Sequence, residues 1–240
     1  MGSVDSIETL GLVDGPGIRC VVFLNGCRLR CKYCHNPEMW NMKNNNYTVD
    51  DLVNKLLRYK PYFKDNGGVT FSGGEPLLQC EFLIEVIKKL KKENIHICLD
   101  TAGVGNGDYK EIVCLTDLIL FDIKHTNKDD YKKLTGGNID ISEKFINEVN
   151  FQNKPVWIRQ VIVPGITDND EYINSLAQYL KKIKNIQRID FLPYHKMGNE
   201  KYKKLNIIYP LDVVPEMDKD KCNLLYEKFI KIYNSNKKSS

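Results

Sequence analysis

Asn25-Gly26-Cys27-Arg28-Leu29-Arg30-Cys31-Lys32-Tyr33-Cys34-His35-Asn36 carries three of the eight cysteines of this 240-residue chain. The three follow the spacing C-x3-C-x2-C, and the next cysteine along the chain is Cys80. Three thiolates on one short loop can hold three irons of a [4Fe–4S] cluster and leave the fourth iron open to a small molecule. Electron carriers use four cysteines for each such cluster. The loop therefore predicts a cluster that reacts with a molecule bound to it.

Zinc is an alternative for the same loop, because Cys27, Cys31, Cys34 and His35 would make a Cys3His set. Cys34 and His35 are adjacent, however, whereas paired zinc ligands are usually separated by two or more residues. A disulfide framework would need an oxidising compartment. The remaining cysteines lie in apolar strand-like or helix-like runs, where a free cysteine packs as a small hydrophobic residue: Cys20, Cys80, Cys98, Cys114 and Cys222.

The composition is that of an ordinary globular protein, with 42% hydrophobic and 28% charged residues. The net charge of +4 is too small to indicate nucleic-acid binding. No apolar run approaches the roughly 20 residues of a membrane span, and residues 1–10 lack the apolar core of a signal peptide. We therefore expect no nucleic-acid or membrane partner and a cytoplasmic, low-oxygen setting.

Short apolar runs alternate with amphipathic helices, and no linker divides the chain. We expect one domain over residues 1–240, with its core in 14–195 and a helical C-terminal extension in 196–240. Strands are expected at 19–24, 69–71, 95–99, 118–121, 156–163 and 189–192. Helices are expected at 49–59, 77–92, 109–115, 129–134, 142–150, 170–183 and 220–233. This alternation predicts βαβ units with a parallel sheet that right-handed crossovers curl, with the helices outside.

Polar and glycine residues follow the predicted strands. The cysteine loop follows the first strand, Gly73-Gly74 the second and Asp100 the third, while Asp122-Ile123-Lys124 and His195 follow the fourth and sixth. Because sites in α/β folds form at the carboxyl ends of parallel strands, we expect these residues to meet at one rim.

The chemistry of these residues suits a zwitterionic amino acid. Gly73 and Gly74 allow close backbone approach to its head group, although a Gly-Gly pair can also be a plain turn. Lys124 and His195 offer donors to a carboxylate. Asp100 and Asp122 offer acceptors to an ammonium group or a monovalent cation, or else they form a rim salt bridge or a helix cap.

Two further charged residues fall where a ligand could contact them. Arg159 lies within an apolar strand, where a charge either pairs inside a barrel or contacts substrate. Asp14 lies in the turn Asp14-Gly15-Pro16-Gly17, which precedes the first predicted strand near the cysteine loop.

At these residues the sequence resembles the radical S-adenosylmethionine superfamily. The hallmark of that family is this cysteine spacing with an aromatic residue, here Tyr33, before the third cysteine. Within the superfamily the chain resembles the activases of glycyl radical enzymes, most of all those of the pyruvate formate-lyase type. The segments that carry the resemblance are 13–19, 27–36, 68–76, 98–101, 122–124, 156–159, 163–165 and 192–195.

The resemblance implies a partial (β/α)6 TIM-like barrel that is open on one side to admit a peptide loop. It implies a [4Fe–4S] cluster whose open iron is chelated by S-adenosylmethionine. Reductive cleavage would give methionine and a 5′-deoxyadenosyl radical, which removes an α-hydrogen from a glycine of a partner enzyme. That partner would be pyruvate formate-lyase, and the electron donor a flavodoxin or ferredoxin, in anaerobic metabolism.

The resemblance also implies roles for individual residues. Cys27, Cys31 and Cys34 would hold the cluster, and Tyr33, Cys34 and His35 would lie beside the adenine or cluster. Gly73 and Gly74 would meet the amino group of S-adenosylmethionine. The residues that surround its methionine part would be Asp100, Asp122, Ile123, Lys124 and His195, with Lys124 and His195 at the carboxylate. Asp100, Thr101 and Asp122 would hold a monovalent cation, and Asp14 and Arg159 would face the incoming peptide.

Three alternatives remain open. The partner could be another glycyl radical enzyme, or the chain could be a radical enzyme that acts on a small molecule. From a different class, it could be a non-catalytic metal-binding interaction module. Some related activases carry an insert with additional cysteine clusters, but residues 37–71 contain no cysteine, which favours the simpler formate-lyase type.

Overall fold

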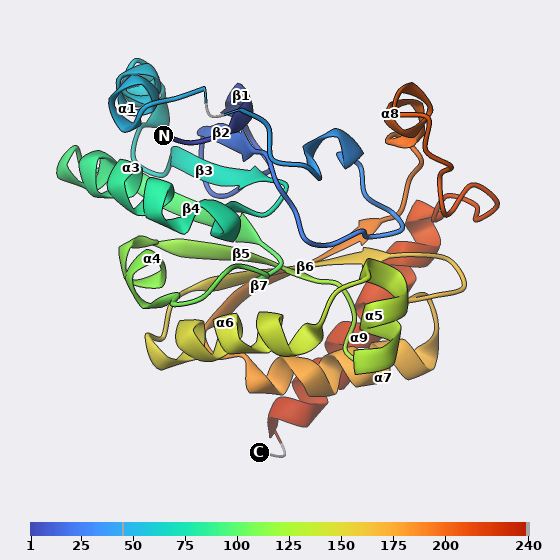
Figure 1. Ribbon diagram of the computed structural model, residues 1–240. Coiled ribbons are helices and arrows are strands. Elements are labelled where there is room, and N and C mark those ends of the chain that lie inside the picture. Colours follow the sequence, from blue (N-terminus) through green and yellow to red (C-terminus); the bar gives the residue numbers. More distant parts are fainter. Residues whose placement is uncertain (45, 239–240) are drawn as a thin grey trace.

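A seven-stranded sheet forms the centre of the molecule in the computed structural model, which describes residues 1–44 and 46–238 (Figure 1). Its strands follow chain order from one edge to the other. The first two strands are antiparallel, and every later pair is parallel. The strands are β1 (Val4–Gly11), β2 (Arg19–Leu24), β3 (Gly68–Gly73), β4 (His96–Thr101), β5 (Leu118–Ile123), β6 (Val156–Ile162) and β7 (Ile186–Pro193).

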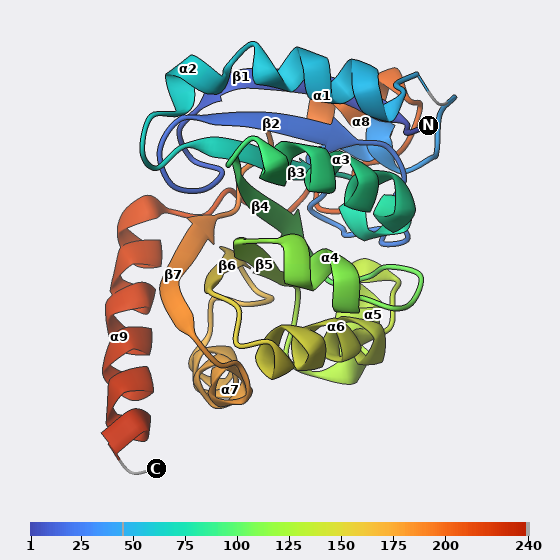
Figure 2. The same cartoon turned by 90° about the vertical axis from the view of Figure 1, so that its left-hand side faces the viewer.

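The helices lie on the convex side of the curled sheet, with the final helix alongside β7 (Figure 2), except for the short helix 199–204, which packs on the 3-10 turn 37–39. They are α1 (Val49–Leu57), α2 (Lys60–Phe63), α3 (Cys80–Lys92), α4 (Lys110–Leu115), α5 (Lys128–Thr135), α6 (Ile139–Phe151), α7 (Asp170–Tyr179), α8 (Asn199–Lys204) and α9 (Lys219–Lys238). Short 3-10 turns lie at η1 (Pro37–Met39), η2 (Pro76–Gln79) and η3 (Leu180–Lys182). The six parallel strands and their outer helices confirm the predicted partial (β/α)6 barrel, and the linear strand order leaves it unclosed among the described residues.

Capping and the periodicity of apolar residues explain why the predicted helices form. Thr48 caps α1 by accepting a hydrogen bond from the Asp51 backbone N–H at 3.1 Å. The apolar face of α3 is buried as its periodicity predicts, at Phe82, Leu83, Val86, Ile87 and Leu90. Pro76 makes the start of the expected 77–92 helix a separate 3-10 turn. No helix among residues 1–44 and 46–238 is both long and apolar enough to cross a membrane.

The prediction of six strands was wrong, because β1 was missed. Its inner residues alternate between half-buried and exposed positions, and among the described residues the strand pairs along one side only, with β2. An amphipathic strand at a sheet edge lacks the continuous apolar run that marks a central parallel strand. The short helices α2 and α8 were missed as well, because each buries a single residue, Phe63 in α2 and Tyr202 in α8, and so shows no apolar face.

The prediction that the cysteines outside the loop pack in the core is confirmed for most of them. Cys20, Cys98 and Cys222 are buried, and Cys80 is half-buried. Cys114 is exposed, so the packing prediction was wrong there: it falls in the last turn of α4 on the side away from the buried Ile112 and Val113.

Candidate active site

A cavity of about 570 Å³ opens at the carboxyl ends of the strands. Every predicted site residue except Ile123 lines it, and Ile123 packs into the hydrophobic core instead. The residues brought together are Asp14, Cys27, Cys31, Tyr33, Cys34, His35, Gly73, Gly74, Asp100, Thr101, Asp122, Lys124, Arg159 and His195. The structure thus brings residues that are far apart in the chain together at one rim of the sheet.

The cysteine loop is fixed by backbone hydrogen bonds at both of its ends. The N–H of Gly26 donates to the carbonyl of Met39 at 2.8 Å, and that of Cys27 to the carbonyl of Trp40 at 3.0 Å. On its other side the N–H of Lys32 donates to the carbonyl of Leu134 in α5 at 2.9 Å. These hydrogen bonds therefore fix the backbone conformation of the loop, and its thiols face the cavity.

All three loop cysteines are free thiols in poorly solvated positions. Burial raises the pKa of Cys27 to about 11 and that of Cys31 to about 12, and it also raises the pKa of Cys34. Lys124 opposes the rise at each of them. Such thiols ionise readily only against a strong positive charge, which bound iron supplies. The donor set fits an iron–sulfur cluster.

Buried polar atoms without a partner gather around the same loop. Seven side-chain atoms among the described residues are buried and make no hydrogen bond: Asn25 Oδ1, Tyr33 Oη, Glu38 Oε2, Trp40 Nε1, Tyr131 Oη, His195 Nδ1 and Tyr202 Oη. Four belong to the loop or its flanks, and His195 stacks on His35 in it. Buried polar atoms are nearly always satisfied, so this concentration marks a place built to receive a polar group.

The structure does not support a single zinc ion on the loop. His35, the fourth ligand in that alternative, places its Nε2 atom 3.1 Å from the carbonyl oxygen of His195. Among residues 1–44 and 46–238 no three His, Cys, Asp or Glu side chains converge around one metal ion. A four-iron cluster is wider than one ion and does not require that convergence.

The glycine pair after β3 lets the backbone pack against the loop. Gly73 adopts a φ of +112°, which side-chain-bearing residues rarely adopt. A Cβ atom on Gly74 would lie 2.3 Å from the carbonyl oxygen of Gly26. The N–H of Gly74 donates to the carbonyl of Leu24 at 2.8 Å, so the end of β3 is joined to the end of β2.

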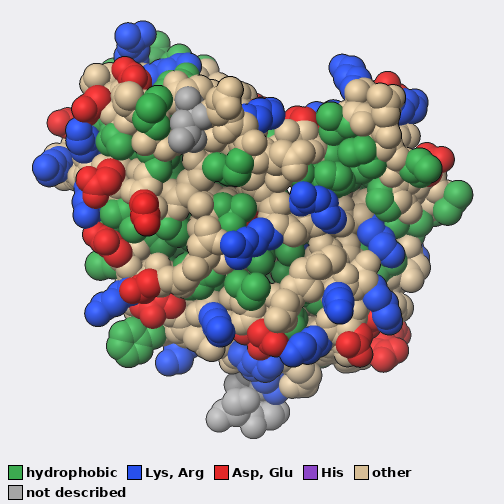
Figure 3. All heavy atoms as spheres, viewed as in Figure 1, with side chains coloured by type: hydrophobic (Ala, Val, Ile, Leu, Met, Phe, Trp, Pro, Cys, Tyr) green, Lys and Arg blue, Asp and Glu red, His purple; other side chains and the backbone are tan. Residues whose placement is uncertain are grey.

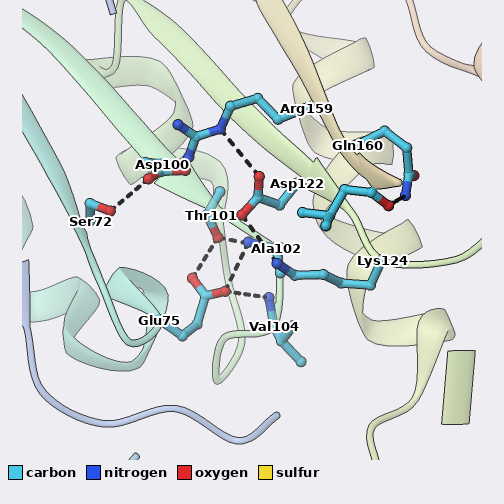
Figure 4. A network of polar contacts seen from close by, with 12 residues as sticks. Ser72, Glu75, Asp100, Thr101, Ala102, Val104, Asp122, Lys124, Arg159 and Gln160 are labelled. Atoms are coloured by element: carbon cyan, nitrogen blue, oxygen red, sulfur yellow. Dashed lines mark hydrogen bonds and ion pairs between the residues drawn. The ribbon is translucent and has the colours of Figure 1, made fainter. Parts of the chain in front are cut away.

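Glu75 is a buried site residue whose contacts sequence reasoning missed. Its Oε1 accepts a hydrogen bond from the Thr101 hydroxyl at 2.5 Å (Figure 4). The same oxygen accepts one from the Leu77 N–H at 3.2 Å. Its Oε2 accepts from the N–H groups of Ala102 and Val104 at 3.1 and 3.3 Å. Glu75 thus joins the loops after β3 and β4. The sequence places a glutamate after Gly-Gly but carries no signal of these partners.

A network of charges spans β4, β5 and β6 (Figure 4). The Arg159 guanidinium bonds to Asp100 and lies 3.2 Å from Asp122 Oδ1 through its Nε atom. It also lies 3.7 Å from Asp14 Oδ1. Lys124 Nζ is 3.1 Å from the other oxygen of Asp122. Of the two readings of Arg159, pairing inside the barrel is therefore the one seen here.

The expected cation ligands do not form a cation site in this arrangement. Asp100 and Asp122 both face the Arg159 guanidinium, and the Thr101 hydroxyl donates to Glu75. A guanidinium thus occupies the place between the two carboxylates. The cation site at Asp100, Thr101 and Asp122 stays a prediction, and no step of the proposal depends on it.

Lys124 carries its positive charge into the cavity. Burial alone would lower the pKa of Lys124, but Asp122 outweighs it and the pKa lies well above its ordinary value. The ammonium group also lies 5.7 Å from the centre of the Tyr33 ring. Lys124 is therefore ready to pair with an anionic ligand group.

The segment after β7 packs onto the cysteine loop, which the sequence did not predict. Lys201 Nζ lies 2.7 Å from Asn36 Oδ1 and 2.5 Å from Glu38 Oε1. A Cβ atom on Gly198 would lie 3.0 Å from the Cα atom of His35. Figure 1 shows α8 and the loop on the same side of the sheet.

Two aromatic residues, Trp40 and Tyr202, pack together beside the cysteine loop. Burial raises the pKa of the Cys34 thiol, and the nearby indole N–H of Trp40 opposes that rise, although it forms no well-aligned hydrogen bond with a described residue. Burial raises the pKa of Tyr202 too, and the proximity of Cys34 and Cys31 raises it further. The Trp40 and Tyr202 rings meet edge to face, with centroids 5.7 Å apart.

On the face shown in Figure 3, Lys and Arg side chains are interspersed with acidic ones and form no continuous basic patch. A basic stripe along one face is the usual electrostatic footprint of a nucleic-acid-binding protein. The face that Figure 3 shows carries no such footprint.

Comparison with known proteins places these features in a family. A family model described as a 4Fe-4S single cluster domain matches residues 13–154. The chain is 52% identical to the pyruvate formate-lyase-activating enzyme of Clostridium pasteurianum over 233 residues, covering 96% of this chain and 98% of that enzyme. It is 44% identical to the enzyme of the same name from Staphylococcus epidermidis over 227 residues, 90% of each chain.

A solved structure shares the fold at lower sequence identity. A radical SAM methyltransferase from Sphaerobacter thermophilus matches with a TM-score of 0.64 and 16% identity, covering 98% of this chain and 75% of that one. At this identity the likeness concerns the fold, and it agrees with the open barrel described above.

Proposed function

This chain belongs to the family of the pyruvate formate-lyase-activating enzymes, and we propose that it activates a glycyl radical enzyme, with pyruvate formate-lyase as the substrate protein. It is a radical S-adenosylmethionine enzyme whose cofactors are a [4Fe–4S] cluster and S-adenosylmethionine.

One observation carries the proposal. Three free thiols with no fourth cysteine beside them line the same cavity as a glycine pair and a charged lysine. The thiols suit a cluster with one open iron. The glycine backbone and Lys124 suit the amino and carboxylate groups of an amino acid. An interaction module would have no need of this combination.

The residues have distinct roles in the proposal. Cys27, Cys31 and Cys34 would hold the cluster, and the aromatic rings of Tyr33 and His35 would lie beside the adenine or the cluster. When bound, the cluster and S-adenosylmethionine supply the electron and the radical that removes a hydrogen atom from the α-carbon of a glycine in the partner. The protein contributes positioning and the exclusion of water, so no side chain is required as a general base.

The methionine part is held from two sides. Gly73 and Gly74 receive the amino group, and Lys124 and His195 bind the carboxylate. Lys124 would then share its ammonium group between the ligand carboxylate and Asp122, while Arg159 keeps Asp122 neutralised. The unpartnered Nδ1 atom of His195 supports its part in this binding.

The partner's glycine loop enters at the open side of the barrel. Asp14 and Arg159 line the cavity and lie 3.7 Å apart, which favours them as the polar contacts of that loop. Arg159 would reach the peptide only by loosening one of its pairs with Asp14, Asp100 or Asp122.

The proposal also covers the domain organisation, the electron donor and the cellular compartment. We take residues 1–240 as one domain, because the segment after β7 packs directly on the cysteine loop. A flavodoxin or ferredoxin serves as the electron donor. All eight cysteines are free, which is typical of a reducing compartment and favours the cytoplasm.

An anaerobic assay tests the function. The protein is reconstituted with iron and sulfide, reduced, and mixed with S-adenosylmethionine and full-length pyruvate formate-lyase. Chromatography follows 5′-deoxyadenosine, and EPR follows the glycyl radical. We expect both products. Cleavage without a radical on the partner would point to another glycyl radical enzyme or a small-molecule substrate, and a well-formed cluster without cleavage would contradict the proposal.

A further inference from the structure

Two aromatic donors beside Cys34 have no partner and no role in the proposed binding of S-adenosylmethionine. Trp40 Nε1 and Tyr202 Oη are both buried, and neither makes a hydrogen bond to any part of the chain that the structure describes. Leaving a buried donor unsatisfied costs free energy, so each calls for an acceptor.

The Trp40 ring is held on three sides. Its backbone carbonyl accepts the N–H of Cys27 at 3.0 Å, which fixes Trp40 against the start of the cysteine loop. The guanidinium carbon of Arg30 lies 4.9 Å from the ring centre, and the Tyr202 ring meets it edge-on. The indole N–H therefore has little freedom to turn toward solvent.

Tyr202 is held equally firmly from the other side. Its side chain is fully buried in α8, and its ring lies edge-on to Tyr209 at 4.9 Å. The neighbouring Lys201 ties α8 to the loop through Asn36 and Glu38. The hydroxyls of Tyr194 and Tyr209 bond to each other at 2.9 Å, so within this tyrosine group it is the Tyr202 hydroxyl that is left over.

The acceptor that both donors share is sulfur. Trp40 is tied to the cysteine loop through the Cys27 N–H, and the Tyr202 ring packs on the Trp40 ring. The turn before α8 also reaches Cys34, a proposed ligand of the cluster: a Cβ atom on Gly198 would lie 3.1 Å from its carbonyl oxygen. A thiolate or sulfide of a cluster is a good acceptor, whereas the protonated thiol is a weak one. Hydrogen bonds to the sulfurs withdraw electron density from the irons and make the cluster easier to reduce.

We propose that Trp40 and Tyr202 donate hydrogen bonds to the sulfurs at the Cys34 corner of the cluster and thereby raise its reduction potential. The inference rests on the cluster site proposed above. It gives the segment after β7 a direct part in the chemistry: α8 places one of the two donors. The cluster becomes easier to reduce when that segment is folded onto the loop.

The test uses the full chain with its reconstituted cluster. Trp40→Phe and Tyr202→Phe each delete one donor and keep an aromatic ring. Tyr194→Phe is the matched control, because it deletes a hydroxyl of the same tyrosine group that is already paired. Iron and sulfide contents are measured first, and an EPR-monitored titration then gives the midpoint potential.

We expect both variants to shift the midpoint to more negative potential while the control matches the wild type. A lost hydrogen bond of ordinary strength should lower the reduced-to-oxidised ratio about tenfold at fixed potential, or about 59 mV for one electron. In wild type, ENDOR of the reduced cluster should detect strongly coupled protons that exchange in D2O, and each variant should lose one.

The outcomes distinguish this inference from the proposed cluster site on which it rests. A wild-type chain that assembles no cluster would overturn the cluster site itself. A full cluster with no strongly coupled exchangeable proton in wild type would overturn only the donor proposal, as would unchanged midpoints in both variants. Should Trp40→Phe fail to hold a cluster, Tyr202→Phe and the wild-type ENDOR spectrum still decide the matter.

Discussion

His35 and His195 stack with their ring centroids 4.1 Å apart and their planes 23° from parallel. The two residues are 160 positions apart in the chain, and His35 Nε2 also contacts the carbonyl oxygen of His195 at 3.1 Å. The stack joins the loop after β2 to the end of β7, so it connects two elements that lie far apart in the sheet order. It leaves His195 Nδ1 buried and without a partner among the described residues.

Substituting His195 by phenylalanine should weaken the binding of S-adenosylmethionine while leaving the stack intact. The phenyl ring keeps the contact with His35 but removes the polar Nδ1 atom. We expect about tenfold weaker binding, the loss of about one hydrogen bond to a charged group. Calorimetry on the reconstituted protein measures the affinity, and His195→Ala should in addition lower the melting temperature. Wild-type affinity in His195→Phe would remove His195 from the binding site.

Substituting Cys31 by alanine should abolish the cluster. With two thiolates left on the loop, the cluster lacks a third corner, and its visible absorbance and the formation of 5′-deoxyadenosine should both be lost. Cys114→Ala is the matched control, because that cysteine is exposed on α4 and should retain both signals. Cleavage of S-adenosylmethionine by the Cys31 variant would contradict the ligand assignment.

Substituting Gly74 by alanine should destabilise the fold even without cofactors. The added Cβ would lie 2.3 Å from the carbonyl oxygen of Gly26, and backbone cannot move aside as a flexible side chain can. We expect a loss of about 1–3 kcal/mol or more in the free energy of unfolding, measured by urea titration. Gly107→Ala, where nothing lies within 4 Å of the new atom, should change it little. Equal effects of the two substitutions would show that the contact is unimportant.

The sequence predicts the position of the site better than its internal pairing. Strand ends are visible because apolar runs stop at glycine and charged residues, and parallel topology then brings those ends to one rim. All but one of the predicted site residues line the cavity. Ile123 was included as part of the segment Asp122-Ile123-Lys124 that carries the family resemblance, but side chains alternate along a strand and it points to the core.

Pairing depends on distances across strands, which spacing along one chain does not reveal. Asp122 and Arg159 are in register on β5 and β6, and only that register places the guanidinium between Asp100 and Asp122. The donors of Glu75 come from a different loop for the same reason. Tyr202 lies in a six-residue helix whose periodicity carries no signal.

Lowering the pH should destabilise the protein partly through His125. Burial lowers the pKa of His125 below its ordinary value of 6.5, and the ring packs on Tyr172. The unfolded chain therefore takes up the proton first, so the free energy of unfolding should fall as the pH decreases below about 6.5. In His125→Gln this contribution is absent, and urea titrations at pH 7.5 and 5.5 should differ less than in wild type. The same pH dependence in both proteins would contradict the assignment.

Substituting Arg159 by methionine should leave the buried Asp100 and the half-buried Asp122 without the cation that they share. Removing one partner of a buried ion pair costs about 3–5 kcal/mol, whereas Arg188→Met, which breaks an exposed pair with Asp190, should cost about 0–1 kcal/mol. Burial already raises the pKa of Asp100 with Arg159 beside it, and without the guanidinium the rise should be larger. A carboxyl whose folded pKa is raised stabilises the fold at low pH and loses that effect as the pH rises through this pKa. The loss of stability in the variant should therefore be smaller at pH 5.5 than at pH 7.5.

Adding Asp100→Asn to the Arg159 variant should restore much of the stability at pH 7.5. Urea titrations of the single and double variants at both pH values measure these effects, and a deficit that neither low pH nor the second substitution reduces would show that Arg159 acts through packing rather than charge.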